Sequence, residues 1–162
     1  MCAARNVAIS TTGAAVIAMA TAFIAPWEGE VRETYLDTIA KPPLLTVCYG
    51  HTGKYAVKGA KYSKAACERI LAEDVGKHYA GMSACVAVQY VPVSVQASLL
   101  ELFFNVGVGA GCNSTMVSLA NAGRYSEACE QLDRWVKAGG KTIRGLVNRR
   151  NASKEMCYLD IK

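Results

Sequence analysis

Closely spaced metal ligands are missing from this sequence. The chain of 162 residues has two histidines and seven cysteines, but it contains no Cys-x-x-Cys pair. Because zinc sites use closely spaced cysteine and histidine ligands, the sequence argues against a metal centre. Internal repeats are also absent, and the 18 lysines and arginines are scattered along the chain. Proteins that bind nucleic acid gather such residues on one stripe, so no nucleic-acid partner is expected.

Charge and leucine are both absent from residues 6–27. As a helix, this stretch would span about 33 Å, which is enough to cross a bilayer. It nevertheless contains seven alanines and several hydroxyl side chains, so its insertion is only marginally favourable. Three interpretations stay open. The stretch is a permanent anchor, a signal peptide cleaved after Ala18-Met19-Ala20, or an anchor that enters the membrane first and leaves it later.

Seven cysteines are many for a chain of this length, and they favour an oxidising compartment with up to three disulfides and one cysteine left over. The alternative is a cytosolic protein with buried free thiols. For a bacterial or phage protein, the oxidising compartment is the periplasm. Proximity along the expected elements favours one pairing among the many that six cysteines allow: Cys48 with Cys67, Cys85 with Cys112, and Cys129 with Cys157, leaving Cys2 over.

The hydrophobic pattern predicts an α+β protein that is mostly helical. Its length suits one domain, with a small antiparallel sheet lobe against a helical lobe and a cleft between them. The expected elements are a short helix from Pro26 to Arg32, a sheet over Tyr35 to Val57, and helices over 63–78, from 93 to about 106, after Ser114, over 126–137 and over 143–159.

Residues 27–53 hold the candidate site. Glu28 lies at an expected helix, Asp37 follows nine positions later, and Thr46 opens a short apolar run. Two carboxylates and a hydroxyl around a cleft can protonate a leaving oxygen and position a water, which is what glycoside hydrolysis needs. Each residue also has a plainer interpretation: an exposed helix glutamate, an aspartate that caps its own turn, and a β-branched strand residue.

This stretch resembles the Glu, Asp and Thr triad of phage lysozymes of glycoside hydrolase family 24. The chain departs from the family pattern between Asp37 and Thr46, where Lys41-Pro42-Pro43 looks like an insertion in an extended loop. The resemblance covers residues 26–158 in family order, through Glu28-Gly29, Thr46 to Gly53, Phe104 to Gly107, Arg134 to Val136, Ala138 to Lys141, and Gly145 to Arg150.

The resemblance implies a lysozyme-like fold with an N-terminal hydrophobic helix. Residues 1–27 would form a signal-anchor segment that is later released, and residues 28–162 a catalytic domain. Glu28 would be the general acid, Asp37 its partner carboxylate, and Thr46 the holder of the attacking water. Three further residues are expected at the cleft: Phe104 and Asn105 on its floor, and Arg149 beside Glu28. Their plainer roles are a buried ring, a helix end and a solvated arginine.

The implied function is that of an endolysin. Such an enzyme is an inverting muramidase that hydrolyses the β-1,4 bond between N-acetylmuramic acid and N-acetylglucosamine in peptidoglycan, without a cofactor. It would be held inactive at the host inner membrane and then act in the periplasm, as a monomer, to lyse the host. Two rivals remain: a lytic transglycosylase, which Asp37 and Thr46 argue against, and a membrane-tethered wall-binding protein without catalysis.

Overall fold

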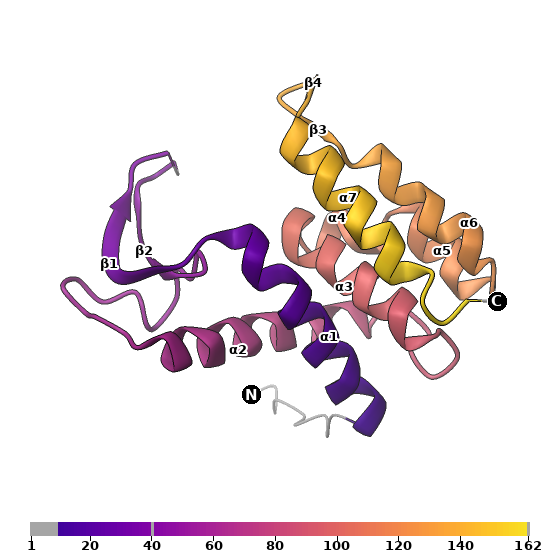
Figure 1. Cartoon of the computed structure of the whole chain (residues 1–162), viewed down its shortest axis with the longest axis horizontal. Helices are drawn as coiled ribbons and strands as arrows, with labels where there is room; N and C mark the ends of the chain where they lie inside the picture. The colour runs from indigo at the N-terminus through magenta and orange to yellow at the C-terminus, as the bar shows by residue number, and fades with distance from the viewer. Residues whose placement is uncertain (1–9, 40, 162) are drawn as a thin grey trace, which may run out of the picture.

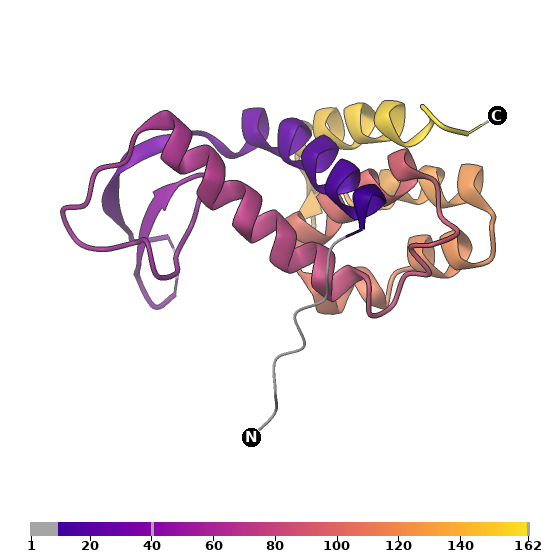
Figure 2. The same ribbon diagram turned by 90° about the horizontal axis from the view of Figure 1, so that it is seen from below.

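The computed structural model describes residues 10–39 and 41–161. A small sheet lobe and a larger helical lobe lie side by side, and α1 and α2 run between them (Figures 1 and 2). The elements are α1 (Thr11–Glu28), β1 (Val31–Asp37), β2 (Leu44–Cys48), α2 (Lys64–Met82), α3 (Val93–Val106), α4 (Val108–Cys112), α5 (Thr115–Asn121), α6 (Tyr125–Glu130), the 3-10 helix η1 (Gln131–Arg134), β3 (Lys137–Ala138), β4 (Lys141–Thr142) and α7 (Arg144–Cys157). The expected mostly helical α+β class is therefore confirmed.

From Thr11 onwards, the apolar N-terminal stretch forms α1, which packs into the helical lobe against α2 and α3. The Ser10 side chain caps the helix by accepting a hydrogen bond from the Gly13 N–H at 3.1 Å. No helix in the described part of the chain is both long and apolar enough to cross a membrane. Buried residues recur every three or four positions along one face of α1: Gly13, Val16, Ala20 and Ile24.

The short helix expected from Pro26 to Arg32 is wrong. Glu28 is the last residue of the long helix α1, and Pro26 lies inside that helix instead of beginning a new one. Gly29 ends α1 because its φ is +67°, a conformation that L side chains rarely adopt. The chain then enters β1 at Val31, so Arg32 belongs to a strand.

Strands β1 and β2 form an antiparallel pair that is shorter than the sheet expected over Tyr35 to Val57. The pair begins earlier, at Val31, and β2 ends at Cys48, which has a positive φ of 57°. Beyond it the sheet lobe continues through isolated bridges, Val47 with His51 and Glu33 with Lys61. The segment Lys41-Pro42-Pro43 lies in the loop between the two strands, where an insertion leaves the pairing intact.

Helix α3 is the centre of the helical lobe, and α1, α2 and α7 all pack against it. Six of its apolar side chains are fully buried: Val95, Ala97, Leu99, Leu100, Leu102 and Phe103. The single helix expected over 126–137 is wrong, because it divides into α6 and η1. A short hairpin of β3 and β4 follows, and it turns at Gly139 and Gly140, which both have positive φ.

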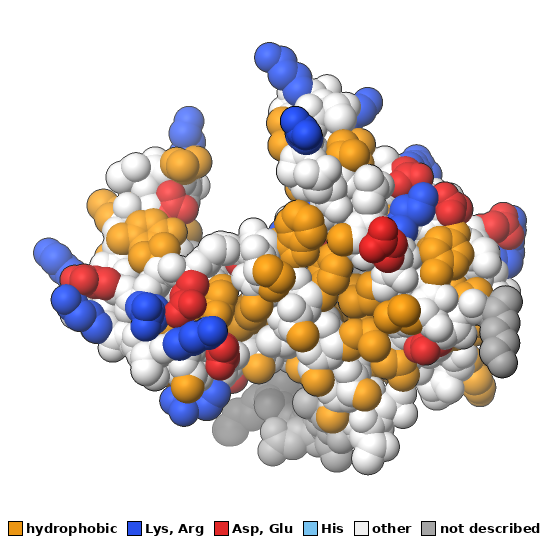
Figure 3. All heavy atoms as spheres, viewed as in Figure 1, with side chains coloured by type: hydrophobic (Ala, Val, Ile, Leu, Met, Phe, Trp, Pro, Cys, Tyr) orange, Lys and Arg blue, Asp and Glu red, His pale blue; other side chains and the backbone are white. Residues whose placement is uncertain are grey.

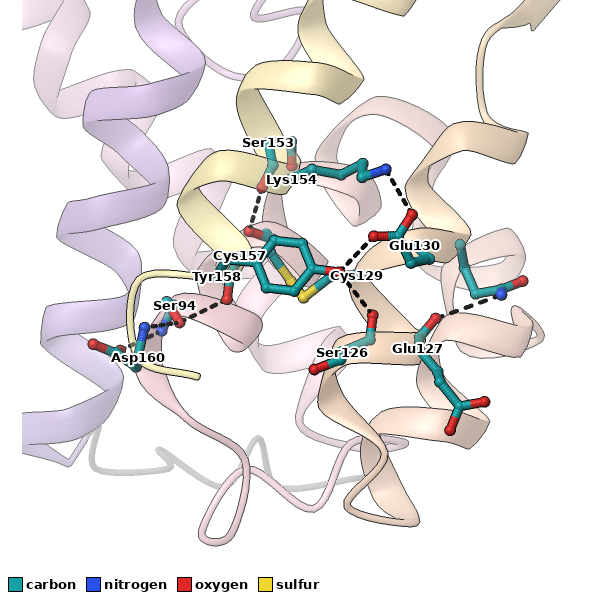
Figure 4. Close-up of a disulfide and its surroundings, with 12 residues drawn as sticks. Ser94, Ser126, Glu127, Cys129, Glu130, Ser153, Lys154, Cys157, Tyr158 and Asp160 are labelled. Carbon is teal, nitrogen blue, oxygen red and sulfur yellow. Dashed lines mark hydrogen bonds and ion pairs between the residues drawn. A yellow bond between two sulfur atoms is a disulfide. The ribbon is translucent and has the colours of Figure 1, made fainter. Parts of the chain in front are cut away.

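The structure contains the three disulfides that proximity favoured. Cys48–Cys67 joins β2 to α2, Cys85–Cys112 joins the segment after α2 to α4, and Cys129–Cys157 joins α6 to α7. Beside the third disulfide, Lys154 donates hydrogen bonds to Glu130 at 2.7 Å and to Asp133 at 2.8 Å (Figure 4 shows the bond to Glu130). Cys2 lies outside the described residues.

Candidate active site

The molecular surface is hollowed between the sheet lobe and the helical lobe, with the β3–β4 hairpin on its far side (Figures 1 and 3). The C-terminal end of α1 lies at the base of this hollow, where the chain passes from one lobe into the other (Figure 1). Glu28 is the last residue of α1, and its side chain keeps 23% of its surface exposed. A partly exposed carboxyl at the floor of a cleft is accessible to a substrate.

Arg149 of α7 holds Glu28 by an ion pair. Its Nη1 donates to Glu28 Oε1 at 2.8 Å, while the arginine side chain itself is only 7% exposed. The pairing implied by the resemblance is therefore present, and Arg149 is not a solvated helix arginine. A guanidinium in this position orients the carboxylate because its donors lie in one rigid plane.

The ion pair continues inward through residues that the sequence analysis did not select. Glu101 of α3 is fully buried, and its Oε1 accepts hydrogen bonds from Arg149 Nε at 2.6 Å and from Arg150 Nη2 at 2.8 Å. Burial is the main cause that lowers the pKa of Arg150, while the charge of Glu101 raises it. Two carboxylates and two guanidiniums thus form one chain of charges, which we call the buried ion network: Glu28, Arg149, Glu101 and Arg150.

Sequence signals for this network exist but are weak. Glu101 is the only charged residue in α3, an otherwise apolar or neutral helix, and an isolated charge on a buried helix indicates a buried partner. Arg149 and Arg150 are adjacent, yet both are buried, which the charge pattern of α7 does not reveal. Only the packing of α3 against α7 brings the three side chains together.

Asp37 and Thr46 share one face of the β1–β2 sheet. Thr46 of β2 pairs with Tyr35 of β1, and Tyr35 lies two residues before Asp37 on the same strand. Asp37 and Thr46 are therefore diagonal neighbours on that face. Asp37 Oδ1 also accepts the Ile39 N–H at 2.9 Å, the capping contact of the plainer interpretation. Thr46 is buried, and its hydroxyl donates to the Leu44 carbonyl at 3.3 Å.

The two expected floor residues lie at the end of α3. The Phe104 ring is half-buried and packs against His78 of α2, with ring centroids 5.1 Å apart. Asn105 is exposed, and its Oδ1 accepts from Arg150 Nη2 at 3.5 Å. Asn105 therefore connects the buried ion network to the surface.

His51 has a structural environment in the sheet lobe. Its side chain is 5% exposed, and its Nδ1 lies 2.6 Å from Asp74 Oδ2 on α2. The ring also packs against Tyr55 at 5.3 Å. These contacts join the sheet lobe to α2, so the His51 side chain has a structural role.

A second hollow, of about 290 Å³, lies in the helical lobe between α5 and η1. Its walls carry amide and hydroxyl groups together with Trp135, and Arg134 Nη1 donates to Thr115 and Gln131 there at 3.3 Å and 3.2 Å. None of the expected catalytic residues lines it.

A mainly helical fold with a small sheet lobe, a hollow between the two lobes and a partly exposed carboxyl where helix passes into sheet is the architecture expected of a lysozyme-like glycoside hydrolase. Residues 25–153 match the family model described as phage lysozyme, and the chain belongs to that family. It is thus a muramidase, an enzyme that hydrolyses peptidoglycan and lyses bacterial cells.

Known proteins resemble the chain over nearly all of its length. The SAR-endolysin of Bacteriophage PS119 is 33% identical over 161 residues, which cover 96% of this chain and 94% of the relative. Among solved structures, the endolysin from Escherichia coli O157:H7 phage FAHEc1 superposes with a TM-score of 0.73 at 25% identity, covering 96% of this chain and 95% of that one. A point mutant of P22 lysozyme has the same fold, with a TM-score of 0.75 at 24% identity over 93% of this chain and 97% of that one.

Proposed function

We propose that the protein is an endolysin in which Glu28 is the general acid for cleavage of the β-1,4 bond between N-acetylmuramic acid and N-acetylglucosamine. The observation that carries this proposal is the ion pair by which Arg149 holds Glu28, the last residue of α1. Glu28 gives its proton to the glycosidic oxygen as the bond breaks. Its partial burial keeps water from competing for that oxygen.

Asp37 and Thr46 bind the water that attacks the sugar. Their shared face on the sheet supports this division of labour, because a carboxylate and a hydroxyl on diagonal neighbours can hold one water between them. Asp37 takes the proton of the water, and the Thr46 hydroxyl fixes its position. In an inverting enzyme the two carboxyls stand roughly 6.5 to 9.5 Å apart, which leaves room for that water.

Asp37 and Thr46 also distinguish hydrolysis from the rival reaction, that of a lytic transglycosylase. A lytic transglycosylase needs one acid and closes an anhydro ring within the sugar, so it has no use for a water held by Asp37 and Thr46. Phe104 and Asn105, at the end of α3, supply an apolar ring and an amide on the cleft floor for the sugar. A wall-binding protein without catalysis would not need the Glu28–Arg149 pair.

Residues 1–27 act first as a signal anchor in the host inner membrane and are then released, so that the soluble monomer works in the periplasm. The stretch without charge at residues 6–27 supports this, as do the names of relatives such as the PS119 SAR-endolysin. Cleavage after Ala20 would remove Val16 and Ala20, which are fully buried against the helical lobe. Their burial supports retention of the segment after release, and the three disulfides suit an oxidising periplasm.

Substitution of Glu28 tests the proposed chemistry. Glu28→Gln should lose more than nine-tenths of the lytic activity of the purified protein on peptidoglycan sacculi, because an amide cannot donate the proton. Glu33→Gln is the matched control, since Glu33 lies on β1 with an exposed side chain and pairs with the exposed Lys61 at 3.1 Å. Retention of a tenth or more of the activity by Glu28→Gln would refute the assignment of the acid.

Fractionation tests the proposed release. The unmodified protein should be found with the inner membrane before depolarisation and in the periplasmic fraction after it, with the same N-terminus in both. A soluble form that begins at Thr21 would show cleavage after Ala20 and refute release, while leaving the muramidase chemistry in place.

A further inference from the structure

Glu101 has no place in the proposed reaction, although it contacts the residue that holds the general acid. It lies on α3, is fully buried, and receives Arg149 Nε and Arg150 Nη2 on the same oxygen, Oε1. Its other oxygen, Oε2, is buried without a hydrogen-bond partner in the described part of the chain. A buried carboxylate on an apolar helix is costly unless its charge is compensated, and here two guanidiniums compensate it.

The geometry of Arg149 links Glu101 to Glu28. One guanidinium donates from Nε to Glu101 and from Nη1 to Glu28, and these two nitrogens belong to the same rigid plane. A shift of the Glu101 carboxylate would therefore rotate or displace the donor that faces Glu28. The position of the general acid therefore depends on α3, to which the Glu28 carboxylate is linked through Arg149.

The balance of charge around Glu28 also depends on Glu101. Arg149 and Arg150 come from α7 and Glu101 from α3, so the other three members of the buried ion network carry one net positive charge. Without Glu101 they would carry two. Positive charge beside a carboxyl favours its ionised form, whereas a general acid must keep its proton.

Other charged groups near α1 leave this balance unchanged. On α2, Glu68 lines a groove with one face of α1, from Ala14 to Ala25, and Glu28 is not among the residues that line this groove. On the β1 side of Gly29, Glu30 and Arg32 pair with each other at 3.3 Å. In the described part of the chain, Glu101 is thus the buried negative charge that offsets the two arginines.

We propose that Glu101 is a positioning residue, which holds Arg149 against Glu28 and offsets the positive charge that Arg149 and Arg150 place beside the general acid. This inference rests on the proposed role of Glu28 as general acid. It assigns to α3 a function beyond packing: it sets the upper pH limit of catalysis through a residue that never touches the substrate.

The pH profile of lysis tests the proposal. Full-length variants are purified and their release of reducing ends from peptidoglycan sacculi is measured across the pH range. Glu101→Gln should move the alkaline limb of the profile to lower pH by about one unit, as expected for one buried charge removed nearby. Arg150→Gln should move the same limb to higher pH, because it removes one positive charge from the buried ion network and leaves Arg149 as the arginine paired with Glu101. Glu130→Gln, which breaks an exposed bond to Lys154 one turn beyond Arg150 on α7, should leave the limb in place.

A purely structural role for Glu101 predicts a different result. Glu101→Gln would then lose activity evenly across pH, with the alkaline limb unmoved, and that outcome overturns the proposal. If thermal unfolding shows that Glu101→Gln does not fold, Arg150→Gln decides, and an unmoved limb in that variant overturns the proposal as well. Failure of the proposed function is recognised separately, because Glu28→Gln would then remain active at every pH.

Discussion

Arg149 Nη1 and Glu28 Oε1 lie 2.8 Å apart, although 121 positions separate the two residues in the sequence. The bond fastens the end of α1 to α7, while Ile24, one turn before Glu28, is fully buried in the helical lobe. Glu28 can meet Arg149 only when α1 is packed in that lobe. The segment proposed to lie first in the membrane is therefore the same segment that completes the active site after release.

Loss of Arg149 should impair both stability and catalysis. In Arg149→Gln, Glu101 keeps only Arg150 as a partner and Glu28 loses its orienting donor. Breaking a buried ion pair in this way costs about 3 kcal/mol, measured as the free energy of unfolding in urea. Arg124→Gln, which removes an exposed pair with Glu127, is the control and should unfold like the unmodified protein. Equal stability of Arg149→Gln and the control would contradict the buried ion network.

Thr46→Val tests the role of the Thr46 hydroxyl separately from the packing of this side chain in the strand. Valine has nearly the same shape, so the buried position opposite Tyr35 should remain filled. Loss of the bond to the Leu44 carbonyl should cost about 1 kcal/mol of stability. Activity should fall at least about tenfold, because one hydrogen bond to the attacking water is lost. Thr46→Ser, which keeps the hydroxyl, should retain most of the activity. Near-normal lysis by the valine variant would show that Thr46 is only a strand residue.

The two faces of α1 should respond differently to substitution. Ile24→Ala leaves a cavity in the core and should cost about 3 kcal/mol of unfolding free energy. Leucines at the exposed Ala14, Ala15 and Ala18 should leave the folded lobe intact but favour the membrane by about tenfold in fractionation before and after depolarisation. Gly13 is unsuited to this test, because it is buried and a leucine there would also disturb packing. An unchanged distribution of the three-leucine variant would contradict marginal insertion.

Acid should weaken the contact between α6 and α7 at Glu130. The hydrogen bond from Lys154 lowers the pKa of Glu130, and the Tyr158 hydroxyl, at 2.5 Å, lowers it further. A carboxyl whose pKa is depressed by folding stabilises the fold above its ordinary pKa, and this contribution disappears as the pH falls through the lowered value. NMR titration should therefore show Glu130 ionising below an ordinary glutamate, and Lys154→Met should raise its midpoint. An unchanged midpoint in Lys154→Met would show that the pair does not persist in solution.

Local patterns in the sequence predicted most of the helices, the small sheet and the disulfide pairing. The errors occurred where one local pattern is compatible with two structures. Pro26 is favoured in a first helical turn, but here it lies near the end of a helix, and the positive φ of Gly29 decides that boundary. Thr46 pairs with Tyr35 in the β1–β2 sheet, and Lys41-Pro42-Pro43 lies in the loop between these two strands. Glu101 was missed because its meaning depends on α7, whose arginines lie nearly fifty positions away.

The products of peptidoglycan digestion test the central claim most directly. Purified sacculi are digested in water enriched in heavy oxygen, and the released fragments are analysed by mass spectrometry. If Glu28 protonates the leaving oxygen while Asp37 and Thr46 direct a water, every new end is a reducing N-acetylmuramic acid that carries one heavy oxygen atom. Anhydro ends without the label would show that the sugar closes on itself, and would contradict the hydrolytic mechanism proposed for this site.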